Sequence, residues 1–199
     1  MKIVKIVMLI IAFGAKASLY AQTATDAFIS VPESVLLDLT TNKRMDLIDL
    51  HNANQKAIVL NNFGDSISIK SLNDNYLFLE KGNSSLQIIV LPMINESKLY
   101  CLIHTNCAPI CDSQIEFYSI NWIKLDSKTF ISPVDKKWFI NEEFPSLELS
   151  LMQFIYDSET LSLQQKYNIQ KDLSPENQLE VKPLLNEEKI YKWNGIRFE

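Results

Sequence analysis

The chain has 199 residues, a formal net charge of −5 and a hydrophobic content of 47%, with 22% of its residues charged. This composition is typical of a globular protein and excludes a chain that stays disordered for lack of apolar residues. The negative charge argues against nucleic acids and anionic membranes as partners, because both repel an acidic surface. With only four glycines in the chain, a nucleotide site built on a glycine-rich loop is also disfavoured.

The first 21 residues have the pattern of a secretory signal peptide. Two lysines precede the apolar run at residues 6–13, and Ala21 is the small residue before the expected cleavage point. The run is too short to cross a bilayer as a helix. The first cysteine is Cys101, so no cysteine stands at the cleavage point to carry a lipid. We therefore expect a mature protein that begins at Gln22, lacks a membrane span and is periplasmic or secreted.

Two short helices are expected next. Ser30 and Glu33 have the spacing of a capping box, and Pro32 is tolerated in a first turn, so this pattern predicts a helix that begins at Ser30. Asn42 is expected to cap a second helix that runs towards His51. The apolar residues of the first helix share one face, which we expect to pack on a sheet: Val35, Leu36 and Leu39.

From Ala57 the pattern changes to short β-prone runs separated by polar turns. Connections this short leave no room for crossover helices, so neighbouring strands must pair antiparallel. A closing hairpin is expected around Asn194-Gly195. The predicted fold class is therefore α+β, with an N-terminal pair of short helices packed on an antiparallel β-sheet. The predicted strands are Ile58–Leu60, Ile67–Ile69, Tyr76–Leu79, Leu86–Leu91, Leu99–Ile103 and Ile115–Tyr118.

A weak similarity of the chain to itself at an offset of 61 residues suggests two similar β-rich units. Ser66 matches Ser127, Phe78 matches Phe139, and residues 85–88 lie over residues 146–149. Strand alternation alone produces part of such a match, so a true duplication and a chance similarity both stay open. The predicted division is a first unit of helices and strands over residues 22–121 and a second β unit over residues 122–199, fused into one globular body.

Three cysteines in an exported chain allow at most one internal disulfide. Cys107 and Cys111 flank a turn that brings them within reach of each other, and an oxidising compartment favours the bond. Cys101 lies in an apolar run and is expected to be buried and reduced. The same stretch contains His104 and Asp112 at a spacing that suits zinc, but the second, distant ligand pair of a structural zinc site is missing from the chain.

Catalytic interpretations of the same residues are weak. A cysteine nucleophile needs a base, and His104 stands three residues from both Cys101 and Cys107. On a strand, however, position 104 faces away from position 101, and no local signature of a cysteine hydrolase accompanies it. Asp46 and Asp49 lie one helical turn apart, which suits paired carboxylates, but a solvated helix face explains them equally well.

Several segments spread over nearly the whole mature chain carry a resemblance to a known family. They are Phe28–Ser34, Asn42–Asp49, Leu72–Leu77, Ala108-Pro109, Asp112-Ser113, Phe117-Tyr118 and Trp122. Together they resemble an uncharacterised family of exported proteins from gut Gram-negative anaerobes, known only as a domain of unknown function. The resemblance implies an α+β fold and a periplasmic or secreted location. It supplies no catalytic residue and no cofactor.

We predict an exported, non-enzymatic module that binds a protein or a glycan, with no cofactor or metal. The contact surface is expected on the sheet face or on the turn that holds His104, Pro109 and Asp112. Two alternatives stay open: a hydrolase whose site is assembled from dispersed residues, and a structural subunit of an envelope assembly with an exposed apolar patch. Three tryptophans are compatible with a sugar-stacking platform, although large aromatics on strands more often form core: Trp122, Trp138 and Trp193.

The first prediction concerns processing at Ala21. Protein recovered from its native envelope should have the intact mass of a chain that begins at Gln22, with or without cyclisation to pyroglutamate. Recovery of a chain that retains residues 1–21 would contradict the signal peptide.

Overall fold

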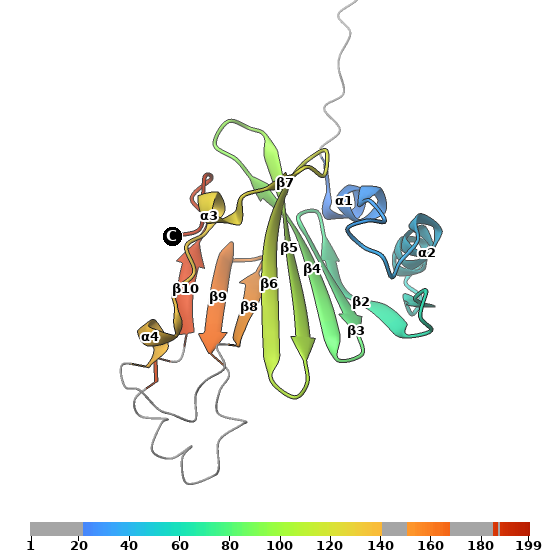
Figure 1. The fold of residues 1–199 in the computed structure, drawn as a ribbon. Coiled ribbons are helices and arrows are strands. Elements are labelled where there is room, and N and C mark those ends of the chain that lie inside the picture. The colour runs from blue at the N-terminus through green and yellow to red at the C-terminus, as the bar shows by residue number, and fades with distance from the viewer. Residues whose placement is uncertain (1–21, 141–150, 168–184, 187) are drawn as a thin grey trace, which may run out of the picture.

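The computed structural model describes residues 22–140, 151–167, 185–186 and 188–199. These residues form a layer of helices, a seven-stranded antiparallel sheet and a three-stranded antiparallel sheet. Figure 1 shows the two N-terminal helices on one side of the large sheet, and the small sheet on the other side, where the two later helices also lie. The predicted α+β class, with N-terminal helices packed on antiparallel strands, is confirmed.

The large sheet is a meander in which each strand pairs antiparallel with the next one along the chain. All six predicted runs lie within its strands, and their antiparallel pairing is confirmed. The strands are β1 (Ile58–Leu60), β2 (Ser66–Asn73), β3 (Tyr76–Lys81), β4 (Ser84–Pro92), β5 (Lys98–Cys107), β6 (Cys111–Ser119) and β7 (Lys124–Leu125).

Strand β4 is buried on both faces. Residues 86–91 are all buried, and alternate side chains enter two different cores. Leu86 and Ile88 face the helices, whereas Ile89 and Leu91 face the small sheet. A strand covered on both sides favours a continuous apolar run over an alternating one, and residues 88–91 are all apolar.

Helices α1 (Ala24–Ser30) and α2 (Thr41–Asn52) cover one face of the large sheet. In Figure 1 they stand beside β2, β3 and β4. The segment that joins them contributes Leu36 and Leu39 to the same core, and Leu39 is completely buried.

The predicted helix start at Ser30 is wrong, because Ser30 is the last residue of α1. The capping box is formed upstream, where the side chains of Thr23 and Asp26 each bond the other's backbone N–H. Val31 is extended, with φ −57° and ψ 129°. A residue before proline is disfavoured in the helical region, so Pro32 ends the first helix instead of opening one.

The second predicted helix is confirmed, although its N-cap is Thr40 and not Asn42. Arg44 on α2 is buried, with 1% of its surface exposed, and its guanidinium donates hydrogen bonds to the carbonyls of Phe28 and Val31. These carbonyls end α1 and have no partner within that helix. Arg44 therefore caps one helix while belonging to the other.

The small sheet packs on the opposite face of the large one. Gln87 on β4 joins the two: its Oε1 accepts hydrogen bonds from the Tyr76 hydroxyl and the Tyr156 N–H, both 3.1 Å, and its Nε2 donates to the Phe154 carbonyl. The strand order is β10-β9-β8. The remaining elements are α3 (Ser127–Phe130), α4 (Lys136–Phe139), β8 (Met152–Asp157), β9 (Ser162–Tyr167) and β10 (Glu188–Lys192).

The closing turn predicted at Asn194-Gly195 is present. Trp193 pairs with Phe198 across it, and Gly195 has a φ of 90°, which a glycine adopts without strain.

The residues matched by the 61-residue offset have different structures. Ser66 begins strand β2 whereas Ser127 begins helix α3, and Phe78 lies in β3 whereas Phe139 lies in α4. Residues 146–149 lie outside the described residues. The division of the chain at residues 121 and 122 stays a prediction.

The burial of Leu39 generates a stability prediction. Leu39→Ala should lower the free energy of unfolding by about 2–5 kcal/mol, because it removes a fully buried side chain and leaves a cavity. The matched control is Leu37→Ala in the same segment, where the side chain is 71% exposed, and it should change stability by less than about 0.5 kcal/mol. Denaturant titration of both variants checks this, and equal midpoints would contradict the packing of Leu39.

Candidate functional site

The turn singled out from the sequence is the hairpin between β5 and β6. Cys107 and Cys111 face each other across it and form a disulfide, with their Cα atoms 3.9 Å apart. Pro109 lies at the exposed tip. The Asp112 carboxylate accepts a hydrogen bond of 3.0 Å from the N–H of Met152, at the start of β8. Asp112 thus holds the two sheets together at this end.

Cys101 is the free cysteine of the chain and is completely buried. Its side chain lies in the core between the two sheets, whereas its strand neighbour Leu102 faces the helices. Burial raises the pKa of the Cys101 thiol well above its usual value, which keeps the sulfur protonated and unreactive. Within the described residues no three His, Cys, Asp or Glu side chains gather as a metal site.

Beside the hairpin, polar groups gather on the helix-facing side of β5 and β6. Glu116 pairs with Lys124 at 2.5 Å and accepts a hydrogen bond of 2.8 Å from the Tyr118 hydroxyl. Burial alone would raise the pKa of Glu116, but the hydrogen bonds from Lys124 and Tyr118 outweigh it and leave the pKa lowered. Burial raises the pKa of Tyr118 to about 12, and the hydrogen bond from its hydroxyl to Glu116 adds to this effect.

His104 is half-buried near this pair. Burial lowers its pKa, and Lys81 lowers it further, while Glu116 and Asp38 act in the opposite direction. Lys81 and Asp38 form an ion pair of 2.6 Å with side chains only 14% and 16% exposed. The environment of His104 thus favours a neutral imidazole surrounded by paired charges.

The three tryptophans do not form one platform. Trp122 packs on Tyr100 and Tyr118 beside the helical layer, Trp193 belongs to the core between the sheets, and Trp138 packs on Phe139 in a third cluster. The indole of Trp193 donates a hydrogen bond of 2.6 Å to the backbone carbonyl of Pro92, at the end of β4. Trp193 is therefore a core residue, whereas Trp122 in a loop and Trp138 on α4 are partly buried against two other clusters.

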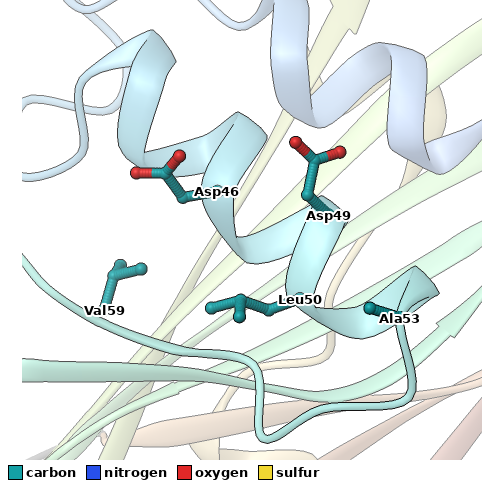
Figure 2. A pocket seen from close by; sticks show the side chains of 5 residues that line it. All are labelled: Asp46, Asp49, Leu50, Ala53 and Val59. Carbon is teal, nitrogen blue, oxygen red and sulfur yellow. The ribbon is translucent and has the colours of Figure 1, made fainter.

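A cleft of about 480 Å³ lies between helix α2 and strand β1. Figure 2 shows Leu50 extending from α2 towards Val59 on β1, with Ala53 at the C-terminal end of the helix. Asp46 and Asp49 lie along the helix at the margin of the cleft. The cleft therefore combines an apolar floor with an acidic rim.

The two carboxylates at the rim are not used to stabilise the fold within the described residues. Within this part of the chain, neither Asp46 nor Asp49 forms an ion pair or accepts a side-chain hydrogen bond. The sequence indicated that these two acids share a helix face. The sequence did not indicate that Val59 lines the same cleft, because this arrangement depends on how α2 packs on the sheet.

A family model described as "Protein of unknown function (DUF3256)" matches residues 16–198. The chain belongs to this family. The fold is similar to a solved domain of an uncharacterized protein from Porphyromonas gingivalis W83, with a TM-score of 0.74 and 24% sequence identity over 87% of this chain and 96% of that one. None of the curated proteins matches the sequence. The DUF3256 chain thus shares its fold with a protein of unknown activity.

In the described part of the DUF3256 chain, none of the helices has the length and apolar character to cross a membrane.

The cysteine arrangement predicts a thiol count. The native protein should show no reactive cysteine, because Cys101 is buried and the other two are bonded to each other. Denaturation without reductant should expose one thiol. A count of three would contradict the disulfide, and zinc analysis of the purified protein would then separate a metal site from free thiols.

The lowered pKa of His104 predicts a pH effect. A group whose folded pKa lies below its unfolded value resists protonation in the folded state, so stability is lost as pH falls through about 6.5 towards the folded value. His104→Gln should flatten the pH dependence of the unfolding midpoint between about pH 7.5 and 5.5 relative to the wild type. An unchanged slope would contradict this role.

Proposed function

We propose that this DUF3256 protein is an exported, non-enzymatic module that binds a partner molecule in the periplasm or outside the cell, and that the cleft between α2 and β1 is its contact surface. The observation that carries the proposal is the combination of an apolar floor, a rim of two carboxylates and an edge strand in one place. Its volume of about 480 Å³ is within the range of ordinary ligand sites, about 300–1,000 Å³.

Exposed apolar side chains on β1 and in the turn after it support a macromolecular partner, with Leu60 on the face of β1 opposite to Val59. Leu60 on β1 is 60% exposed and Phe63 in the following turn is 75% exposed. Leu37 lies nearby, because the side chain of Asn62 donates a hydrogen bond to the Leu37 carbonyl. Large apolar side chains grouped at one edge of a molecule favour contact with another surface.

The tyrosines with strongly raised pKa values do not support the hydrolase alternative. The pKa values of Tyr76 and Tyr167 are raised to about 12, mainly by burial. Tyr76 belongs to the core between the sheets and Tyr167 to a smaller cluster with Phe139, and neither lines the cleft beside α2. Desolvation in a core explains them without a catalytic task.

The disulfide-closed hairpin is a second candidate contact surface. Its tip at Pro109 is exposed, and the Cys107–Cys111 bond restrains the backbone before any partner arrives. A loop restrained in this way loses less conformational entropy on binding. The hairpin remains a proposal alongside the cleft.

Site-specific photo-cross-linking in living cells tests the contact surface. A benzophenone side chain at Ala53, an exposed residue of the cleft, should yield a defined cross-linked species in the envelope fraction. The matched control is the same group at Glu159, an exposed turn residue between β8 and β9. A cross-link at Ala53 that is absent at Glu159 supports the proposal, whereas equal or no cross-linking at both positions contradicts the cleft.

A further inference from the structure

Strand β1 has an unpaired edge. It is the first strand in the order of the large sheet, and within residues 22–140, 151–167, 185–186 and 188–199 it pairs only with β2. The N–H of Asn61 donates to the Asp65 carbonyl, and the N–H of Ile69 donates to the Ala57 carbonyl. Residues 57, 59 and 61, in and beside β1, therefore turn their backbone groups towards β2. In an antiparallel ladder the residues between them point the other way. The backbone N–H and C=O of Leu60 are therefore directed outwards.

The outward backbone groups adjoin the cleft. Val59 turns its side chain towards α2 and forms the floor, while its neighbour Leu60 presents its backbone at the open edge of the sheet. Of the outward N–H groups, that of Ile58 bonds to the Lys56 carbonyl and that of Asn62 to the Asp38 carbonyl, so the one directed at a partner along this edge is that of Leu60. A chain placed along β1 would meet hydrogen-bonding groups on one side and the floor beneath α2 on the other.

We propose that the cleft binds an extended, basic peptide segment, which adds to β1 as a further antiparallel or parallel strand. This inference rests on the proposed function of the cleft and names its partner. An extended backbone fits this edge, because it offers an N–H and a C=O opposite those of Leu60. Side chains on one face of that segment would enter the space between α2 and β1.

The two carboxylates at the rim favour basic side chains in the bound peptide. Asp46 and Asp49 lie on successive turns of the same helix side, at the rim, with no cation paired to them in the described part of the chain. A lysine or arginine can lay its aliphatic stem over Leu50 and Val59 and reach these carboxylates with its charged end. An acidic segment would be repelled from the same rim.

A second copy of this chain fits the cleft less well. The strand it would offer, Ile58–Leu60, contains no basic side chain to meet the acidic rim. A glycan offers no amide groups at the spacing of a strand. Dimerisation through β1 and glycan binding are therefore outcomes that would overturn the inference.

Fluorescence anisotropy with synthetic peptides tests the inference on the mature chain. The probe is a short labelled peptide in which lysine and valine alternate, and its matched partner has glutamate in place of lysine. The lysine peptide should bind in a salt-sensitive manner and the glutamate peptide should not. Equal binding of the two peptides, or binding of neither, would overturn the basic partner.

Variants of the rim separate charge from the rest of the cleft. Asp46→Asn combined with Asp49→Asn should weaken binding of the lysine peptide by about fivefold or more, since two exposed ionic contacts are lost. The charge-matched control is Asp74→Asn combined with Glu159→Gln, two exposed acids away from the cleft, and it should bind as the wild type does. Equal weakening by both pairs would indicate a general effect of net charge and would overturn the rim as the selective element.

The backbone contact has its own readout. N-methylation of the peptide at the residues that face β1 should abolish binding, whereas N-methylation at the alternate residues should preserve it, because only the first set donates to the strand edge. Equal effects of the two sets would overturn strand addition.

If a partner cross-links at Ala53 but no lysine peptide binds, the cleft remains the contact surface and the peptide inference alone fails. Self-association in sedimentation experiments, lost on Leu60→Asp, would replace the peptide with a second copy.

Discussion

The central strands of the large sheet are apolar on both faces, and this constraint governs the rest of the architecture. Ile88 and Ile89 are adjacent in sequence, and both are completely buried, on opposite sides of β4. Each face must be covered, because apolar surface left in water costs about 25 cal/mol per Å². The helices α1 and α2, which precede the sheet in the chain, cover one face, and the later strands β8 to β10 cover the other. The order of elements in the sequence thus reproduces the order of layers in space.

Two buried polar side chains give these layers a defined position. Gln87 places its amide between the sheets and satisfies groups of β3 and β8, so a shift of the small sheet by one residue would leave buried polar groups unpaired. Arg44 has the same effect on the helices, because its bonds to Phe28 and Val31 fix the end of α1 relative to α2. Desolvation lowers the pKa of Arg44, partly offset by Glu33, and its Nε has no hydrogen-bond partner in the part of the chain that the structure describes. The charge is therefore buried at a cost that its carbonyl contacts must offset.

The parts of this structure that local sequence specifies were predictable. Strand runs separated by polar turns indicated the meander, and the residues of the second helix were identified with an error only at its cap. The first helix was misplaced because two capping-box patterns lie close together, Thr23 with Asp26 and Ser30 with Glu33. Only the first is used, since Val31 before Pro32 leaves the helical region. The cleft was not predictable, because Leu50 and Val59 meet only after α2 has packed on the sheet.

Strand β1 is one of the edge strands of the two described sheets, together with β7, β8 and β10. Natural sheets usually blunt an edge with charge, proline or a bulge, because unpaired backbone groups invite pairing with other chains. Strand β1 is short but consists of isoleucine, valine and leucine, and none of these devices lies within it. Its protection comes from α2, which overhangs one side and places two carboxylates at the approach. Two carboxylates repel an acidic strand more strongly than a basic one, so the charge that limits unwanted pairing would also favour a basic partner.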